Sequence, residues 1–170
     1  MTHQSTDTTR RGVSTLNAVR ASSWVEDQRS AALLRFAAGF YAIAWAVHTG
    51  DHLRRGFSSI TSEVTVLGTT TAVLQIAAVV LVLTRNRWAP LVAVAIGLPD
   101  GIGIAAVHLL PHWSSFSDAF PGAHGTGVTG FSWFAAIVEI VGALTFAAAG
   151  AYCLMRSGLP DGDHARPSSA

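Results

Sequence analysis

Four apolar runs constrain this chain more than any other feature of its sequence. They cover residues 31–50, 64–84, 88–110 and 131–155. Each is about twenty residues or longer, which is the length that a helix needs to cross about 30 Å of hydrocarbon. In lipid, only a helix satisfies its own backbone hydrogen bonds over such a stretch. The sequence therefore predicts an all-α fold, an integral membrane four-helix bundle with no β-sheet.

Composition agrees with a chain that lies in a bilayer. Half of the 170 residues are hydrophobic and 12% are charged, with a mean hydropathy of +0.41. These values are too apolar for a soluble domain of this size to cover its surface with polar groups. Small polar and charged residues gather at the two ends of the chain. We therefore expect flexible cytoplasmic tails at residues 1–22 and 157–170, on either side of a four-transmembrane-helix domain at residues 23–156.

The arginines predict an orientation. All eleven Lys+Arg residues are Arg, and only Arg54 and Arg55 belong to the first or third connection. The positive-inside rule then places both termini in the cytoplasm and these two connections outside. A lysine-free chain with abundant Ala, Val and Arg is typical of a GC-rich bacterial genome, so we expect a bacterial plasma membrane. The cytoplasmic arginines are Arg10, Arg11, Arg20, Arg29, Arg85, Arg87, Arg156 and Arg166.

Histidines mark the outer ends of the first and third runs. The first run ends in an HxxxH motif, His48 to His52, and the third ends in another, His108 to His112. Residues four apart on a helix lie about 6 Å from each other on one face. That spacing lets two imidazoles bind one metal ion or two adjacent ions. Because the two runs point in the same direction, we predict one metal site at their shared outer end.

The residues around these motifs suggest which cofactor the site holds. Imidazole nitrogens suit zinc, copper or iron. Asp51 and Asp118 are candidates for an oxygen ligand, or for the acceptor that fixes an imidazole tautomer. A single haem b, with His48 and His108 as its axial ligands, is the alternative cofactor.

Two residues argue against the HxxxH geometry. Gly50 can end the first helix before His52, and Pro111 disfavours helical geometry at residue 110. The histidines would then be interfacial or structural side chains rather than ligands. His124, in a glycine-rich loop, is the weakest candidate of all.

Two carboxyl groups are predicted deep in the bundle. Asp100 precedes His108 in the third run, and Glu139 lies at about the same depth in the fourth. A charged carboxylate in mid-bilayer costs several kcal/mol, so each is expected to face the interior and to have a partner. Gln75 and Tyr41 are candidate hydrogen-bond partners, and the two acids are expected to share a proton if they are neighbours. The alternative is a protonated interhelical contact that only specifies packing.

The third connection, residues 111–130, has no Lys or Arg. Loops of this length are usually lids, binding elements or disordered segments. Spaced aromatic residues argue against disorder, so we expect a cap over the outer mouth of the bundle, with an interfacial anchor as the alternative. These aromatics are Trp113, Phe116, Phe120 and Phe131.

Three function classes remain. The first is a metal- or haem-binding membrane protein, and the second is a proton-coupled small carrier that uses Asp100 and Glu139. The third is a non-catalytic accessory subunit, in a homo-oligomer or a larger membrane complex. A net charge of +1 argues against nucleic acid as a partner. The sequence has no nucleophile-elbow motif and leaves open whether the chain is an enzyme.

Overall fold

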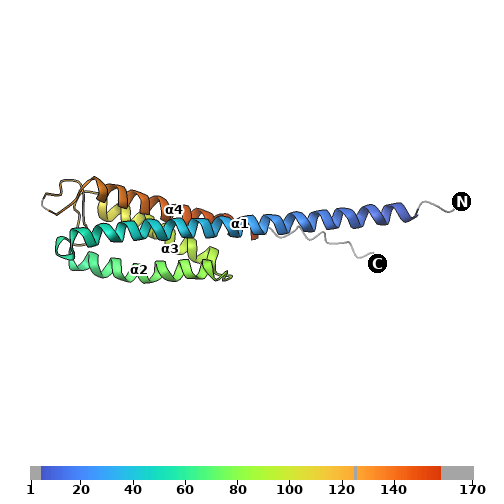
Figure 1. Cartoon of the computed structure of the whole chain (residues 1–170), viewed down its shortest axis with the longest axis horizontal. Helices are drawn as coiled ribbons and strands as arrows, with labels where there is room; N and C mark the ends of the chain where they lie inside the picture. The colour runs from blue at the N-terminus through green and yellow to red at the C-terminus, as the bar shows by residue number, and fades with distance from the viewer. Residues whose placement is uncertain (1–4, 125, 158–170) are drawn as a thin grey trace, which may run out of the picture.

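The computed structural model of this chain describes residues 5–124 and 126–157. Within those residues every regular element is a helix and no strand occurs, so the all-α prediction is confirmed. Four helical segments, Gln28–Arg55, Ser62–Leu83, Ala89–His108 and Gly130–Arg156, are long and apolar enough to cross a membrane. The elements are α1 (Ser5–Arg55), the short 3-10 helix η1 (Phe57–Ser59), α2 (Ser62–Leu83), α3 (Ala89–His108) and α4 (Gly130–Ser157), labelled in Figure 1.

Helix α1 begins at Ser5, much earlier than the first predicted span. Residues 5–22, where we expected a tail, are helical. No proline occurs in the chain before Pro90, and a helix that has nucleated propagates until such a residue or a cap interrupts it. The flexibility of the two tails stays a prediction, and residues 158–170 lie outside the described residues.

The far end of α1 decides the geometry of the first HxxxH motif. The helix continues through Gly50 to Arg55, since one glycine in a helix interior costs only about 1 kcal/mol. It ends because Gly56 takes a left-handed φ of 82°, and its N–H donates to the carbonyl oxygen of His52 over 2.9 Å. Gly50 therefore does not end the helix, and His48 and His52 keep the i, i+4 relation.

The second HxxxH motif behaves differently, because α3 ends at His108. Pro111 disfavours α-helical dihedrals at residue 110, so the helix cannot extend through the motif. His112 consequently lies in the connection rather than one turn along the same helix. The objection raised by Pro111 is thus confirmed, whereas the objection raised by Gly50 is wrong.

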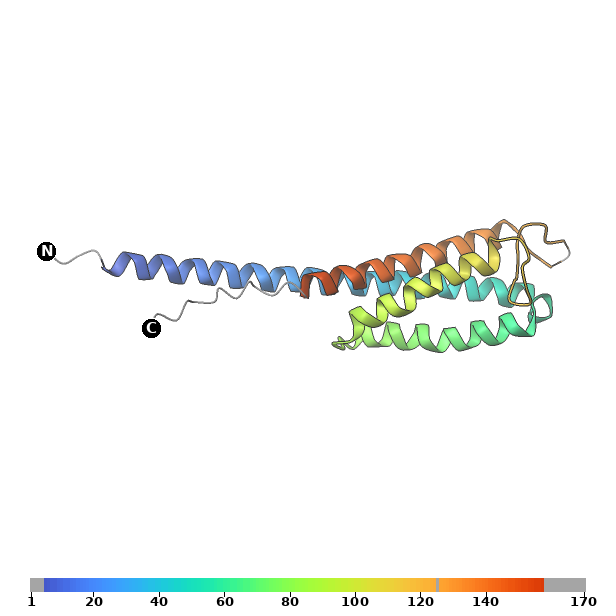
Figure 2. The ribbon, with the colours of Figure 1, turned by 180° about the vertical axis from the view of Figure 1, so that it is seen from behind.

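Helix α4 packs along both α1 and α3, while α2 lies at the edge against α3 and α1 (Figures 1 and 2). The first connection, residues 56–61, and the third, residues 109–124 and 126–129, lie at the same end of the bundle. We call it the connection end, and we call the opposite end, where α4 finishes, the terminal end. This arrangement brings the last turns of α1 and α3 together at the connection end.

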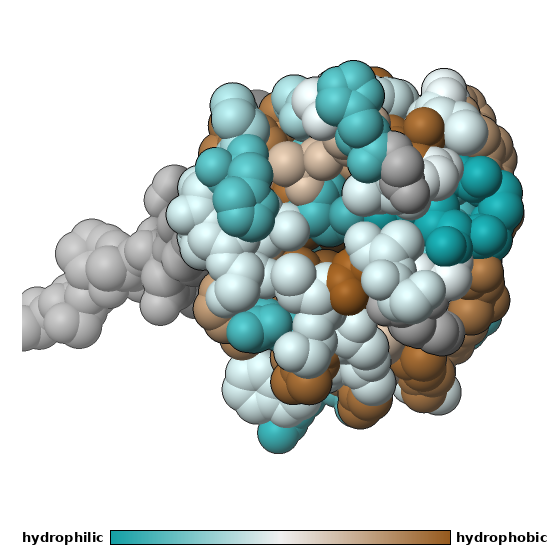
Figure 3. Space-filling view, turned by 90° about the vertical axis from the view of Figure 1, so that its left-hand side faces the viewer, coloured by the Kyte–Doolittle hydropathy of each residue, from teal (hydrophilic) through white to brown (hydrophobic). Residues whose placement is uncertain are grey.

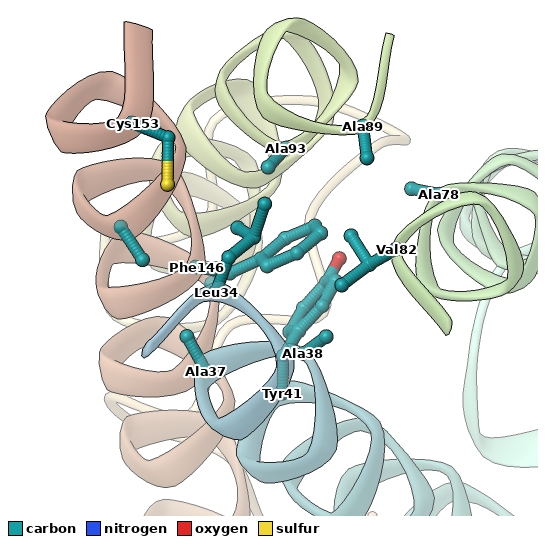
Figure 4. Packing of buried hydrophobic residues seen from close by; sticks show 12 residues of the cluster. Leu34, Ala37, Ala38, Tyr41, Ala78, Val82, Ala89, Ala93, Phe146 and Cys153 are labelled. Atoms are coloured by element: carbon teal, nitrogen blue, oxygen red, sulfur yellow. The ribbon is translucent and has the colours of Figure 1, made fainter. Parts of the chain in front are cut away.

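The hydrophobic core occupies the terminal half of the bundle (Figure 4). The ring of Tyr41 stacks on that of Phe146 with centroids 5.1 Å apart, and small side chains surround the pair. A Cβ added at Gly97 would lie 2.6 Å from the carbonyl oxygen of Ala143, so α3 and α4 approach as closely as only glycine permits. The other core residues are Leu34, Ala37, Ala38, Ala78, Val82, Ala89, Ala93, Ala149 and Cys153.

Candidate metal centre

Three histidines meet at the connection end. His48 and His52 lie on the last turns of α1, and His108 is the last residue of α3. Each offers one ring nitrogen such that the three atoms all lie within 4.8 Å of one another. The ring centroids of His48 lie 4.8 Å from those of both His52 and His108. His48 and His108 are only 2% and 1% exposed, whereas His52 is half-buried.

The His48 ring is oriented by a carboxylate. Its Nδ1 is hydrogen-bonded to Oε2 of Glu139 on α4, and both side chains are buried. Because an ionised carboxylate only accepts, this contact places the ring proton on Nδ1. The opposite nitrogen, Nε2, is buried and has no hydrogen-bond partner among the described residues. A carboxylate on one imidazole nitrogen and a free lone pair on the other is the usual arrangement of a metal-binding histidine.

The His108 ring is oriented by the third connection. Its Nδ1 lies 3.1 Å from the backbone carbonyl oxygen of Asp118. A carbonyl oxygen only accepts, so the proton is again on Nδ1 and Nε2 keeps its lone pair. His52 adds another nitrogen, since its Nδ1 is buried without a hydrogen-bond partner in the described part of the chain. Two of the three rings are thus fixed in the tautomer that a metal ligand needs.

The two aspartates near the cluster bind arginines. The Asp51 carboxylate accepts from Arg54 Nη2 over 2.7 Å and from the Ser132 hydroxyl over 3.1 Å. Asp118 receives Arg55 Nη2 at 2.6 and 2.7 Å from its two oxygens. The structure therefore places both predicted oxygen ligands in ion pairs, and the backbone carbonyl of Asp118 contacts the histidine cluster at His108.

Sequence reasoning missed both arginines as parts of the site. Arg55 is fully buried in its side chain, and Arg54 also donates to the carbonyl oxygen of Gly127 over 2.9 Å. Their spacings of three and four residues from Asp51 are those of helical ion pairs, and this signal was available in the sequence. The contact of Arg55 with Asp118, 63 residues away, had no such local signal.

The third connection covers the histidine cluster. The N–H groups of Asp118 and Phe120 donate to the carbonyl oxygens of Val107 and His108 over 3.1 and 2.9 Å, which folds the connection back onto the end of α3. The Phe120 ring then packs on the His108 ring with centroids 4.6 Å apart. Phe120 is 4% exposed, so this part of the connection is the cap that its aromatic residues predicted.

His112 and His124 do not belong to the cluster. Both are exposed side chains of the third connection. Trp113 and Phe116 are exposed as well, at 53% and 43%. Of the four histidines in the two HxxxH motifs, the structure therefore brings together three.

The two deep carboxyls have separate partners. Asp100 accepts from the Tyr41 hydroxyl over 2.7 Å and from Gln75 Nε2 over 2.6 Å, whereas Glu139 is bound to His48. Tyr41 and Gln75 are thus hydrogen-bond partners of a deep acid, as the sequence suggested. The hydrogen bonds of Asp100 and Glu139 go to different partners; the shared proton, expected if the two acids are neighbours, stays a prediction.

Comparison of the chain with protein families, with curated proteins and with solved structures gives no match. No family is assigned.

Proposed function

We propose that this chain is a multi-pass integral membrane protein that binds one transition-metal ion through His48, His52 and His108. Both termini lie in the cytoplasm and the connection end faces outward, in a bacterial plasma membrane. Glu139 and the Asp118 carbonyl orient two of the ligands. Assembly of the chain into a homo-oligomer or a larger complex stays a prediction.

The observation that carries this proposal is the set of three ring nitrogens within 4.8 Å of one another. Leaving a buried polar atom unsatisfied costs about 1–3 kcal/mol, and native proteins keep few such atoms without a reason. His48 Nε2 and His52 Nδ1 are both of this kind. A metal ion that accepts their lone pairs removes the cost, which is why the cluster favours a ligand-binding role over a packing role.

The contacts between the rings favour a bare ion over a haem. A haem lies between its two axial imidazoles and keeps them apart. The His48 and His108 rings instead touch each other, with centroids 4.8 Å apart, and His52 lies 5.4 Å from His108. Three imidazoles suit zinc, copper or iron, and in a tetrahedral site they leave one position for water or a small ligand.

The surface of the helices supports insertion into a bilayer. Large apolar side chains point outward, including Phe36 at 74%, Ile43 at 67% and Val66 at 66% exposure. A soluble protein rarely exposes so many contiguous apolar residues. The distribution of arginines between the two ends of the bundle supports the orientation by the positive-inside rule.

Elemental analysis by mass spectrometry tests the proposal. Protein purified in detergent, without chelators or a polyhistidine tag, is expected to carry near-stoichiometric zinc, copper or iron. A His48→Ala/His108→Ala variant is expected to lose the metal, while the matched His124→Ala variant, changed at an exposed histidine, keeps it. Equal metal content in all three proteins, or none in the parent after reconstitution with each metal, would contradict the proposal.

A second candidate function is a proton-coupled carrier, which the Tyr41, Asp100 and Gln75 cluster favours. Gln75 is 4% exposed and its Oε1 has no hydrogen-bond partner among the described residues. Ionisable groups within membrane segments often mark proton or ion pathways. The carrier function predicts pH-driven flux in proteoliposomes that is lost in Asp100→Asn, whereas the metal function predicts that this variant keeps its metal.

A further inference from the structure

A hollow lies on the outside of the cap at the connection end. It has a volume of about 420 Å³, and each water occupies about 30 Å³ of liquid, so it has room for an ion with its shell of waters. Figure 3, which looks onto this end, shows patches of hydrophilic residues among pale and hydrophobic ones. The polar side chains that line the hollow are Ser58, Ser59, Thr61, His112, Ser117, Asp118 and Thr126.

The hollow and the histidine cluster share one residue. Asp118 lines the hollow, and its carboxylate Oδ2 lies 3.4 Å from Nδ1 of His108. The same residue contacts the ligand ring through its carbonyl oxygen. The thickness of a single residue therefore separates the hollow from the buried cluster, on the side that the proposed topology exposes to the outside.

The lining has the chemistry of a cation site. Among the lining residues Asp118 is the one with a full charge, and no Lys or Arg is among them. Arg55 holds Asp118 from the buried side, with no exposure of its own side chain. The Thr126 hydroxyl is buried with no hydrogen-bond partner among the described residues. His112 adds an exposed imidazole, so nitrogen and oxygen donors face one space.

We propose that this hollow is an entry site that captures a hydrated divalent transition-metal ion, with His112 and Asp118 as its first ligands, before the ion passes to His48, His52 and His108. This role rests on the proposed metal centre. It also gives the second HxxxH motif a purpose: His108 is the permanent ligand, and His112 is the transient one.

Stopped-flow measurement of Co²⁺ binding to metal-stripped protein in detergent tests the entry site. His112→Ala is expected to lower the association rate constant several-fold, because the variant lacks the imidazole that binds the incoming ion first. The dissociation rate constant falls by the same factor, because an entry site lowers the barrier in both directions, and the Kd is unchanged. His112→Gln, which keeps the size and polarity but loses the imidazole, is expected to behave likewise. His124→Ala, in the same connection but outside the hollow, is the matched control.

Three results would overturn the entry site. The association rate constant of His112→Ala could equal that of the parent, or His124→Ala could slow binding as much. A changed Kd with an unchanged association rate would make His112 a permanent ligand instead. Failure of the metal centre itself is recognised separately, because the parent protein would then give no binding signal with any metal.

Discussion

Glu139 gives the sharpest test of the proposed metal centre. Its carboxylate is the partner of His48 Nδ1, and both side chains are 3% exposed. Loss of such a partner of a ligating histidine typically lowers metal affinity by about 10–100-fold. Since each tenfold change corresponds to about 1.4 kcal/mol, removal of the carboxylate should cost about 1.4–2.8 kcal/mol of binding free energy.

Two substitutions separate the charge of Glu139 from its geometry. In Glu139→Gln the amide oxygen still accepts from Nδ1, so the ring stays oriented and only the negative charge is lost. We expect this variant to bind zinc about tenfold more weakly than the parent, at the low end of that range. In Glu139→Leu both the negative charge and the hydrogen bond that orients the ring are lost. The zinc affinity should then fall by about 100-fold. Competition titration with a chromophoric zinc chelator in detergent measures both values.

Asp100 provides the control, because it is the other deep acid but its partners are Tyr41 and Gln75. Asp100→Asn should weaken zinc binding far less than Glu139→Leu does, since Asp100 has hydrogen bonds to Tyr41 and Gln75 and Glu139 is the acid bound to His48. The reasoning is refuted if Glu139→Leu binds zinc as tightly as the parent. It is also refuted if Asp100→Asn weakens binding as much as Glu139→Leu does.

Three further predictions follow from contacts described above. Arg55→Gln breaks a buried ion pair with Asp118 and should lower the free energy of unfolding by about 3–5 kcal/mol, measurable as reduced thermal stability in detergent. Gly97→Ala places a Cβ 2.6 Å from the Ala143 carbonyl oxygen and should destabilise the bundle. The control is Gly39→Ala, whose Cβ meets nothing within 4 Å and which should keep the stability of the parent. Equal melting temperatures of the two variants would contradict the close packing of α3 on α4. Acidification should release the bound metal, because imidazole ligands must be deprotonated; zinc retention that does not change between neutral and acidic pH would argue against histidine ligation.

The helices were predictable from sequence, and some of their ends were not. Apolar runs of membrane-spanning length predicted all four elements, because length and composition alone determine such segments. The end of α1 depended on which of two glycines acts as the cap. Gly56, with its left-handed φ, does so, and Gly50 lies within the helix. Both glycines are permissive, so local sequence could not distinguish them.

The candidate site was predictable where its residues shared a helix face or a bundle end. His48, His52 and His108 followed from spacing and topology, and Pro111 correctly placed His112 outside the helix. Glu139 was recognised as a deep acid, but its contact with His48 joins residues 91 apart. Such pairings depend on the rotation of α4 against α1, which small residues at the interface set and which periodicity alone does not specify.

The distribution of buried apolar residues along the bundle determines which end unfolds first. The main cluster of buried apolar residues, from Leu34 and Tyr41 on α1 to Phe146 on α4, occupies the terminal half. The connection end is instead held by polar contacts around three imidazoles that come from two helices, with Glu139 from α4. Without the ion, this end resists local opening with buried apolar residues outside the main cluster, among them Val107 and Phe120. An ion bound at the proposed site would link α1 and α3 through their histidines and α4 through Glu139, so metal would stabilise the connection half of the bundle as hydrophobic packing stabilises the terminal half.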